Sequence, residues 1–481
     1  MCTRTIQRSA VPWALALSLL AVLSRHGFAE ELRLPSDSII PIQSVDEPPF
    51  PTPTSDGGSA DGSADGSDSS GSNDQVDQAE QNEDIDPDSG QSAGLITRMT
   101  GIDKYGLNLS VDWVLGWNTV FFGGLLPGHW ADQNIGTVEL DTDFEKMFGW
   151  KGAKGDITFL HRRGSNATDL AGDVLDYNGY DNFPEALGEL YELWIEQEFF
   201  DGKLSLLAGK VVTNDYFGHV TNAELFLGND FETLPGMVQY MPQYPNSATG
   251  VQLFANPNEH FYAGFGVYDG RFGGEGINTG ELGPQFNGYL FYVGETGIKY
   301  SLGKRKLPGQ FSVGGWGQSG ELPRWDGGTQ DGTAGFYLIH QQTLWQDPCD
   351  DNQDIAAFLT WSTGDGRVNQ FVKGATAGFQ WTGPIYRRDQ DVFGLGVVWG
   401  QQTSELGQPG NTTQAQLYPD LPAEFANGRL AANEWEWQTF YNIHLNEVVQ
   451  LQPNLTYIHD PGRSTLIRDP LAFSILILLN F

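Results

Sequence analysis

Hydrophobic and polar residues alternate along much of the chain between residues 95 and 481. The pattern is clearest in 471–481, where every odd-numbered position is apolar and the even-numbered positions are smaller and mixed. Successive side chains of a strand point to opposite faces, so this stretch predicts a strand with one strongly apolar face. A membrane-crossing helix needs about 20 residues, whereas a tilted strand crosses with about 9–11. The length therefore fits a membrane-spanning strand.

The same alternation recurs in earlier segments that are separated by turns rich in Gly, Asp, Asn and Pro. It predicts strands with an apolar face in 107–117, 138–144, 435–445 and 451–457. Soluble β-sandwiches also alternate, so the pattern does not decide the class by itself. Aromatic residues near the ends of apolar faces favour a membrane barrel with interfacial girdles. These aromatic residues are Trp113, Trp117, Trp399, Trp435 and Trp437.

The connections between predicted strands fall into two length classes. Tight turns are predicted at 201–202 and 446–448, and long loops at 164–186, 213–246 and 402–433. Short turns on one rim and long loops on the other are typical of bacterial outer-membrane barrels.

A strand edge cannot stay unpaired in lipid, so the apolar terminal strand is expected to close the sheet onto the first one. The residues from 95 to 481 suffice for about 14–18 strands, and bacterial single-chain barrels use even numbers. The predicted fold is therefore all-β, a transmembrane outer-membrane β-barrel of about 16 antiparallel strands. A barrel of this width encloses an aqueous lumen.

The N-terminus predicts export from the cytoplasm. Arg4 and Arg8 precede an apolar run at 11–23, and the small-x-small sequence at 27–29 follows. This pattern is typical of a secretory signal peptide over residues 1–29.

Residues 30–94 differ in composition from the rest of the chain. Gly, Ser, Asp and Pro dominate, and the segment holds sixteen Asp or Glu residues but one basic residue, Arg33. It has too few apolar residues to offset chain entropy and is expected to be a disordered acidic spacer. It lacks the ligand spacing of a calcium loop. The net charge of −35 also argues against nucleic acid as a partner.

Four stretches, at 188–218, 244–270, 377–400 and 451–464, resemble the carbohydrate-selective porin family of the OprB type. They are spread over much of 95–481 and follow the family's order. The resemblance implies a sixteen-stranded barrel in the bacterial outer membrane that passes sugars by diffusion and catalyses no reaction. The long acidic spacer and the strongly negative barrel depart from the family. They leave a general or cation-preferring porin open as the alternative.

One predicted strand, 191–199, offers the chemistry that a sugar needs. Sugars have hydroxyl groups that bind carboxylates and apolar ring faces that stack on aromatic side chains. Tyr191, Leu193 and Ile195 are expected to face lipid, which turns the alternate residues toward the lumen. Those residues are Glu192, Trp194, Glu196 and Glu198. The alternative is that Trp194 packs against an inward-folded loop while the glutamates line a wet channel.

Further charged residues are candidates for the solute path. Opposed charges set a transverse field at a constriction, and unopposed acids favour cations. The acidic and lysine candidates are Asp112, Glu139, Asp141, Glu295 and Lys299. The basic residues expected to oppose them are Arg162, Arg163, Arg387 and Arg388. The alternative for Arg387 and Arg388 is an exposed, solvated turn.

The sequence shows no arrangement typical of an enzyme, a cofactor or a metal site. The histidines lack metal-ligand spacing, and the acidic stretch 347–354 suits a solvated turn. An anchoring protein tethered through the spacer is a third hypothesis. The expected partners are outer-membrane lipid, small hydrophilic solutes and the barrel assembly machinery, which would bind the C-terminal strand ending in Phe481. A homotrimer is left open.

Overall fold

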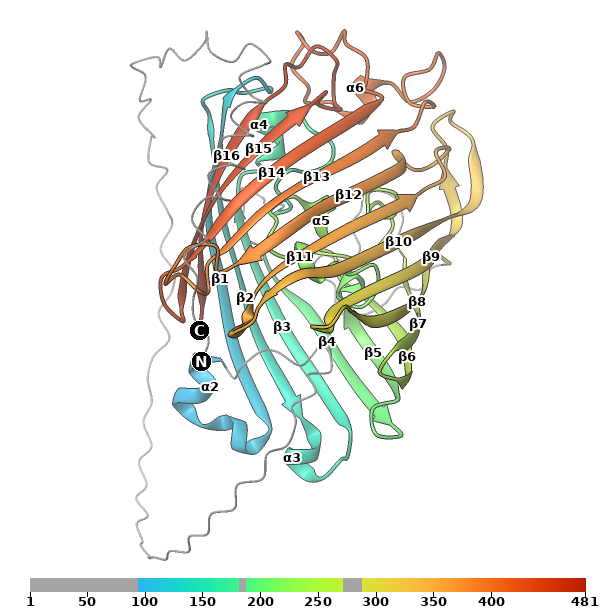
Figure 1. Cartoon of the computed structure of the whole chain (residues 1–481). Helices are drawn as coiled ribbons and strands as arrows, with labels where there is room; N and C mark the ends of the chain where they lie inside the picture. The colour runs from blue at the N-terminus through green and yellow to red at the C-terminus, as the bar shows by residue number, and fades with distance from the viewer. Residues whose placement is uncertain (1–93, 181–186, 271–287) are drawn as a thin grey trace, which may run out of the picture. The chain divides into compact units, whose positions relative to one another are not determined.

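The computed structural model describes residues 94–180, 187–270 and 288–481. Here the chain forms a closed barrel of sixteen antiparallel strands, each paired with its neighbours in sequence (Figure 1). The last strand, β16 (Leu471–Asn480), pairs with the first, β1 (Leu107–Phe122), and Trp113 lies opposite Leu479. The prediction that the terminal strand closes the sheet is confirmed, and closure leaves no backbone edge unpaired.

The remaining strands follow each other around the barrel. The first seven of them are β2 (Trp130–Asp143), β3 (Ala153–Gly164), β4 (Leu187–Phe199), β5 (Leu204–Val211), β6 (Ala248–Asn258), β7 (Phe261–Asp269) and β8 (Leu290–Leu302). The next seven are β9 (Leu307–Pro323), β10 (Thr329–Asp347), β11 (Asp350–Thr363), β12 (Phe371–Thr382), β13 (Val392–Gln402), β14 (Asn433–His444) and β15 (Val449–His459).

The outer wall carries the apolar faces that the alternation predicts. Leu193 and Ile195 are 45% and 47% exposed, although both are large aliphatic residues. On the same outer face, Trp361, Trp399 and Trp435 form a row across β11, β13 and β14, with ring centroids 5.9 Å apart in each neighbouring pair. Exposed apolar side chains in such number are what a lipid-facing wall requires.

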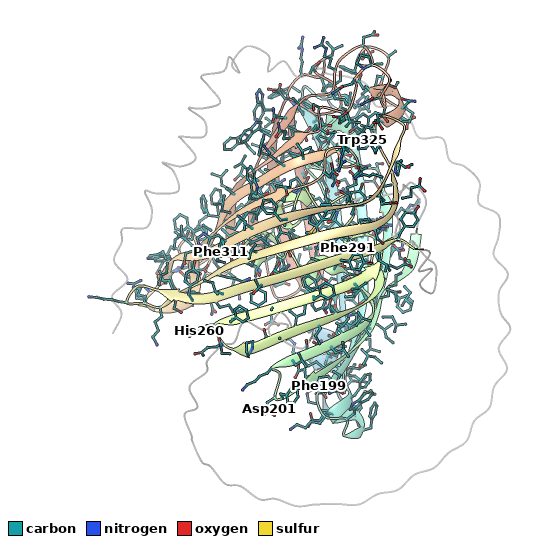
Figure 2. The ribbon with its side chains drawn as sticks, turned by 90° about the vertical axis from the view of Figure 1, so that its right-hand side faces the viewer. Phe199, Asp201, His260, Phe291, Phe311 and Trp325 are labelled. Carbon is teal, nitrogen blue, oxygen red and sulfur yellow. The ribbon has the colours of Figure 1, made fainter. Side chains whose placement is uncertain are left out.

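The two rims differ in the length of their connections. One, the short-turn rim, includes the turns at 200–203, 259–260 and 445–448. The long connections at 212–247 and 403–432 begin and end at the opposite, long-loop rim. Figure 2 shows Asp201 and His260 on the short-turn rim and Trp325, in the β9–β10 connection, on the other. The predicted separation of short turns from long loops is confirmed.

Helices occur in the connections and before β1. They are α2 (Leu95–Thr100), η1 (Ile102–Tyr105), α3 (Phe144–Phe148), α4 (Thr168–Ala171), η2 (Thr213–Asp215), η3 (Thr221–Ala223), α5 (Asn229–Glu232) and α6 (Gln414–Leu417). Among the described residues, no helix is both long and apolar enough to cross a membrane. The predicted signal peptide lies outside the described residues, and so does the predicted acidic spacer apart from Gly94; both stay predictions.

The hydrophobic core lies inside the barrel, where the β5–β6 loop folds inward. Phe226, Phe231 and Met237 of this loop are at most 5% exposed and pack with residues of the inner wall. Gly396 of β13 makes room for two of them, since a Cβ there would lie 2.5 Å from a Phe231 ring carbon and 2.9 Å from one of Phe226. Burying an aromatic side chain contributes about 1.5–3 kcal/mol, so the loop is held firmly in the lumen.

Candidate functional site

The β5–β6 loop, residues 212–247, is tied to several strands of the inner wall. Its Gly236 N–H donates to Ser362 Oγ of β11 at 3.0 Å, and its Leu227 N–H donates to Gln438 Oε1 of β14 at 2.5 Å. Backbone groups buried in a barrel need such partners, and polar side chains on the lumen face provide them. The loop therefore lies inside the barrel and narrows the lumen.

Glu295 of β8 is another of these anchors. It accepts hydrogen bonds from Tyr262 Oη at 2.6 Å, Tyr337 Oη at 2.7 Å and Gly218 N at 2.9 Å. The carboxylate is 7% exposed and so does not line the water-filled surface. The prediction that Glu295 belongs to the solute path is wrong, because the inward-folded loop covers it.

The β3–β4 loop also enters the lumen and contacts the β5–β6 loop. Its Gly179 N–H donates to Leu227 O at 2.8 Å, and its Asp176 O accepts from Asn229 N at 3.0 Å. On the wall side, Asn178 Nδ2 donates to Asn118 Oδ1 of β1 at 2.6 Å. The two loops thus support each other inside the barrel, while the lumen-facing acids of β1, β2 and β4 keep partly exposed side chains.

The lumen face of β1–β4 is acidic. Antiparallel pairing places Asn108 opposite Asp141 and Asp141 opposite Asp156, and Glu139 lies next along β2. Carboxylate oxygens of Glu139, Asp141 and Asp156 lie within 4.8 Å of one another. Asp112 acts electrostatically on this group. The period-2 alternation of adjacent strands brings these acids together, because each stands on the inward face.

The beginning of the β5–β6 loop extends the acidic surface into the lumen. Val212 N–H donates to Glu192 Oε1 at 2.8 Å, which places Asp215 close enough for its charge to act on Glu192. The loop contains no lysine or arginine, and its one histidine is His219. The acidic surface therefore continues from the wall onto the loop.

The charged groups of the loop have shifted pKa values. Burial and the nearby Glu224 raise the pKa of Asp215 to about 6, although His219 opposes this effect. Burial, followed by repulsion from Glu224, raises the pKa of Glu232 to about 8. Burial alone lowers the pKa of His219, but the hydrogen bond to Glu224 at 3.0 Å and the surrounding carboxylates raise it to about 9. At neutral pH His219 is thus cationic and partly offsets the acids.

Aromatic side chains lie beside the acids. Trp194 stands on the lumen face of β4, opposite Asp156 on one side and Gly209 on the other. Trp194, Tyr216 and Phe254 are each partly buried and pack against the lumen core. Trp194 therefore does pack against an inward-folded part of the protein while keeping an exposed portion beside the carboxylates.

Eight of the predicted path residues stand on the lumen face with a partly exposed side chain. They are Asp112, Glu139, Asp141, Glu192, Trp194, Glu196, Glu198 and Lys299. Glu198 Oε1 pairs with Lys154 Nζ at 3.1 Å. Their placement agrees with the prediction, and their contact with a solute stays a prediction.

The predicted arginine side of the constriction is wrong. Arg162 does point inward, but it is 1% exposed and pairs with Glu189 at 3.4 Å beneath the surface. Arg387 and Arg388 lie in the β12–β13 turn on the short-turn rim. There Arg388 Nε bonds Asp391 Oδ2 at 2.7 Å, and Arg387 has a left-handed backbone with φ of 68°. The exposed-turn alternative holds for this pair. Arg163 stands on the outer face, as the strand alternation requires.

Tyr191 is also placed differently from the prediction. A register irregularity between β3 and β4 pairs Thr158 with Glu192 and Phe159 with Leu190, which leaves Tyr191 without a partner across the ladder. The extra residue of such a bulge shifts the alternation by one. Tyr191 is consequently 8% exposed and packs with lumen residues such as Leu160.

The sequence analysis did not name several charged residues of this site. Asp156 could have been found, because it stands two residues before Thr158 on a strand that alternates. The positions of Asp215, His219 and Glu232 could not have been predicted, because these residues lie in a long loop. A loop has no regular alternation from which the direction of its side chains can be inferred. The inward fold of the loop is decided by contacts distant in sequence.

Comparisons with known proteins agree with this architecture. The model of the carbohydrate-selective porin, OprB family, matches residues 131–481. Porin B of Pseudomonas aeruginosa is 23% identical over 362 residues, which cover 70% of this chain and 78% of that protein. The putative porin QuiX of Acinetobacter baylyi is 22% identical over 387 residues, which cover 73% and 83%.

Among solved structures, the high-pH structure of Pseudomonas putida OprB superposes with a TM-score of 0.69 at 17% identity. The match covers 82% of this chain and 99% of that one. A likeness at this identity supports the fold, and the family match over most of the barrel supports the membership. The chain belongs to the carbohydrate-selective porin family of the OprB type.

Proposed function

We propose that the chain forms a passive channel in the bacterial outer membrane through which monosaccharides such as glucose, and small oligosaccharides, diffuse into the periplasm. Family membership and the barrel fold indicate a channel and not an enzyme. The observation that carries the proposal is the acidic lumen surface formed by β1–β4 and the start of the β5–β6 loop, which we call the constriction. There, carboxylates that accept hydroxyl hydrogen bonds lie beside partly exposed aromatic rings.

Two partners in the membrane belong to the same proposal. Outer-membrane lipid would cover the apolar outer wall, and the barrel assembly machinery would bind β16 and the terminal Phe481. Association into a homotrimer stays a prediction as well.

Sugar binding at the constriction is tested by block of ion current in planar bilayers. We expect Trp194→Ala to weaken the block by glucose or a maltose-like sugar by about 2- to 10-fold, because the change removes the ring face next to Glu192 and Glu196. Stacking on an aromatic side chain contributes about 0.5–1.5 kcal/mol, so Trp194→Phe should keep most of the block. An unchanged sugar affinity in Trp194→Ala would remove Trp194 from the path.

A general or cation-preferring porin is the second candidate, favoured by the acids that meet at the constriction. The distinguishing result is an open channel that prefers cations and ignores sugars.

The charge of the constriction also predicts a pH dependence. Asp215 and Glu232 titrate near pH 6 and pH 8, and each loses its negative charge below its pKa. The preference for potassium over chloride should therefore fall as pH decreases from about 8 to about 5. Reversal potentials in a salt gradient measure it. A variant with Asp215→Asn and Glu232→Gln should show a flatter profile, and a flat wild-type profile would contradict the assignment.

A further inference from the structure

A second group of carboxylates lies outside the constriction, buried between the β3–β4 loop and the barrel wall. Asp173 follows α4 in the loop, and Glu434 and Glu436 stand on the lumen face of β14. Their carboxylate oxygens lie within 4.8 Å of one another. Asp173 is 1% exposed and the two glutamates are 0% exposed. Three acids are thus gathered where water does not reach them.

Two of the three carboxylates hold the surrounding backbone in place. Glu434 Oε1 accepts from Val174 N at 3.0 Å and from Leu175 N at 2.8 Å, and Glu434 Oε2 accepts from Gly462 N of the β15–β16 connection. Asp173 Oδ2 accepts from Tyr177 N at 2.8 Å. The group therefore joins two loops to one strand.

Other oxygen atoms of the group receive no hydrogen bond from the surrounding protein in the described part of the chain. They are both carboxylate oxygens of Glu436, Asp173 Oδ1, Tyr177 Oη and Asp230 Oδ1. The contact between Asp173 and Glu436 lies within the group itself. Tyr177 is 0% exposed and Asp230 is 2% exposed, and both interact electrostatically with the carboxylates. A buried carboxylate without compensation is strongly unfavourable. A buried group of this kind is neutralised either by protons or by a cation, and a bound cation could contact several of these oxygens at once.

Arg463 is a basic side chain in contact with the group, and it already has other partners. Arg463 Nε donates to the main-chain oxygen of Asp173 at 3.1 Å, and its Nη1 pairs with Asp169 at 3.1 Å. One guanidinium cannot balance three buried carboxylates while it also pairs with Asp169. The group therefore carries more potential negative charge than Arg463 can neutralise, and a bound cation would supply the missing positive charge.

We propose that Asp173, Glu434 and Glu436 bind a calcium ion that fastens the β3–β4 loop inside the lumen. The donor set consists of oxygen atoms, which hard cations prefer, and includes no histidine or cysteine. Two ligands at about 2.3–2.6 Å from one calcium ion can lie up to about 5 Å apart, and the carboxylate oxygens of the group lie within 4.8 Å of one another. The proposal concerns the loop and does not depend on which solute the channel carries.

Through this loop, the ion would also support the constriction. The β3–β4 loop binds the β5–β6 loop through Gly179 and Asp176. A calcium ion would therefore stabilise the arrangement that narrows the lumen, from a position outside the solute path.

Calcium binding is measured on the purified full-length chain in detergent after treatment with a chelator. We expect one tightly bound calcium ion per chain, and at least tenfold weaker binding in Glu436→Gln. Calcium should raise the thermal unfolding midpoint of the wild type by several degrees, because a ligand that binds the folded state stabilises it. It should leave the midpoint of Glu436→Gln unchanged.

The matched control is Glu139→Gln, which removes a carboxylate from the accessible acidic group of β2 and should keep the tight site. Folding of each variant is checked by the heat-dependent mobility of the barrel on gels. If Glu436→Gln does not fold, Asp173→Asn is tested in its place. A wild-type chain that binds no calcium, or a Glu436→Gln chain that binds it as tightly, overturns the proposal. Loss of the tight site in Glu139→Gln would also overturn the proposal, because it would show that the ion binds the acidic group of β2 at the constriction. Calcium binding is measured without sugar or ion current, so failure of the sugar proposal is seen separately.

Discussion

Neutralising three acids at the constriction, with Glu139→Gln, Glu192→Gln and Asp215→Asn combined, should reduce the preference for potassium over chloride by about tenfold. A unit charge about 4 Å from an ion contributes about 1 kcal/mol in water and more in a confined space, and about 1.4 kcal/mol changes a ratio tenfold. The three residues are adjacent through the contacts of β2, β4 and the β5–β6 loop. Removing them together therefore removes a local field.

The reversal potential of single channels in a salt gradient provides the measurement. A matched triple variant at the short-turn rim, Asp201→Asn, Glu259→Gln and Glu447→Gln, has the same change in net charge. These side chains are exposed and distant from the constriction, so selectivity should change little, since charges separated by more than about 10 Å are screened. Equal effects of the two triple variants would show that overall charge, and not the constriction, sets the selectivity.

Removing the Glu295 carboxylate should produce the largest effect on stability. In Glu295→Ala the hydroxyls of Tyr262 and Tyr337 and the N–H of Gly218 lose their acceptor. Each unsatisfied buried donor costs about 1–3 kcal/mol, so we expect a loss on the order of 4 kcal/mol. The β5–β6 loop should also loosen, which raises single-channel conductance and its noise.

Thermal unfolding followed by gel mobility, together with single-channel recording, tests this expectation. Glu295→Gln keeps an oxygen acceptor, and its amide can donate to a tyrosine hydroxyl, so it should recover most of the stability. Glu259→Ala, at an exposed position of the β6–β7 turn, controls for the loss of a glutamate. A Glu295→Ala channel with wild-type conductance and stability would show that other contacts hold the loop.

Sequence patterning was sufficient for the barrel wall because two solvents act on it. Lipid outside and water inside require apolar and polar side chains on opposite faces, and a strand alternates with a period of two. The apolar faces of β1, β14 and β16 could therefore be assigned residue by residue, and the closing pair of β1 with β16 followed from the need to leave no edge. The inward acids Asp112, Glu139 and Glu192 were found in the same way.

The alternation predicts that a side chain points into the barrel, but it does not predict whether that side chain is exposed to water. Arg162 and Glu295 point inward as predicted, yet both are buried, Arg162 in an ion pair with Glu189 and Glu295 under the β5–β6 loop. The bulge between β3 and β4 turns Tyr191 from the predicted lipid-facing side to the inside of the barrel. Such a register shift depends on the partner strand and cannot be read from β4 alone.

By itself, then, the sequence determined which face of the clearly alternating strands meets lipid, how the strands close and which family the chain resembles. The tertiary structure decided how the lumen is filled. The paths of the β3–β4 and β5–β6 loops depend on contacts with β8, β11 and β14, which lie far along the chain. The pattern of hydrophobic and polar residues within a loop does not predict such contacts, because a loop is stabilised by the surfaces it packs against and has no periodicity of its own.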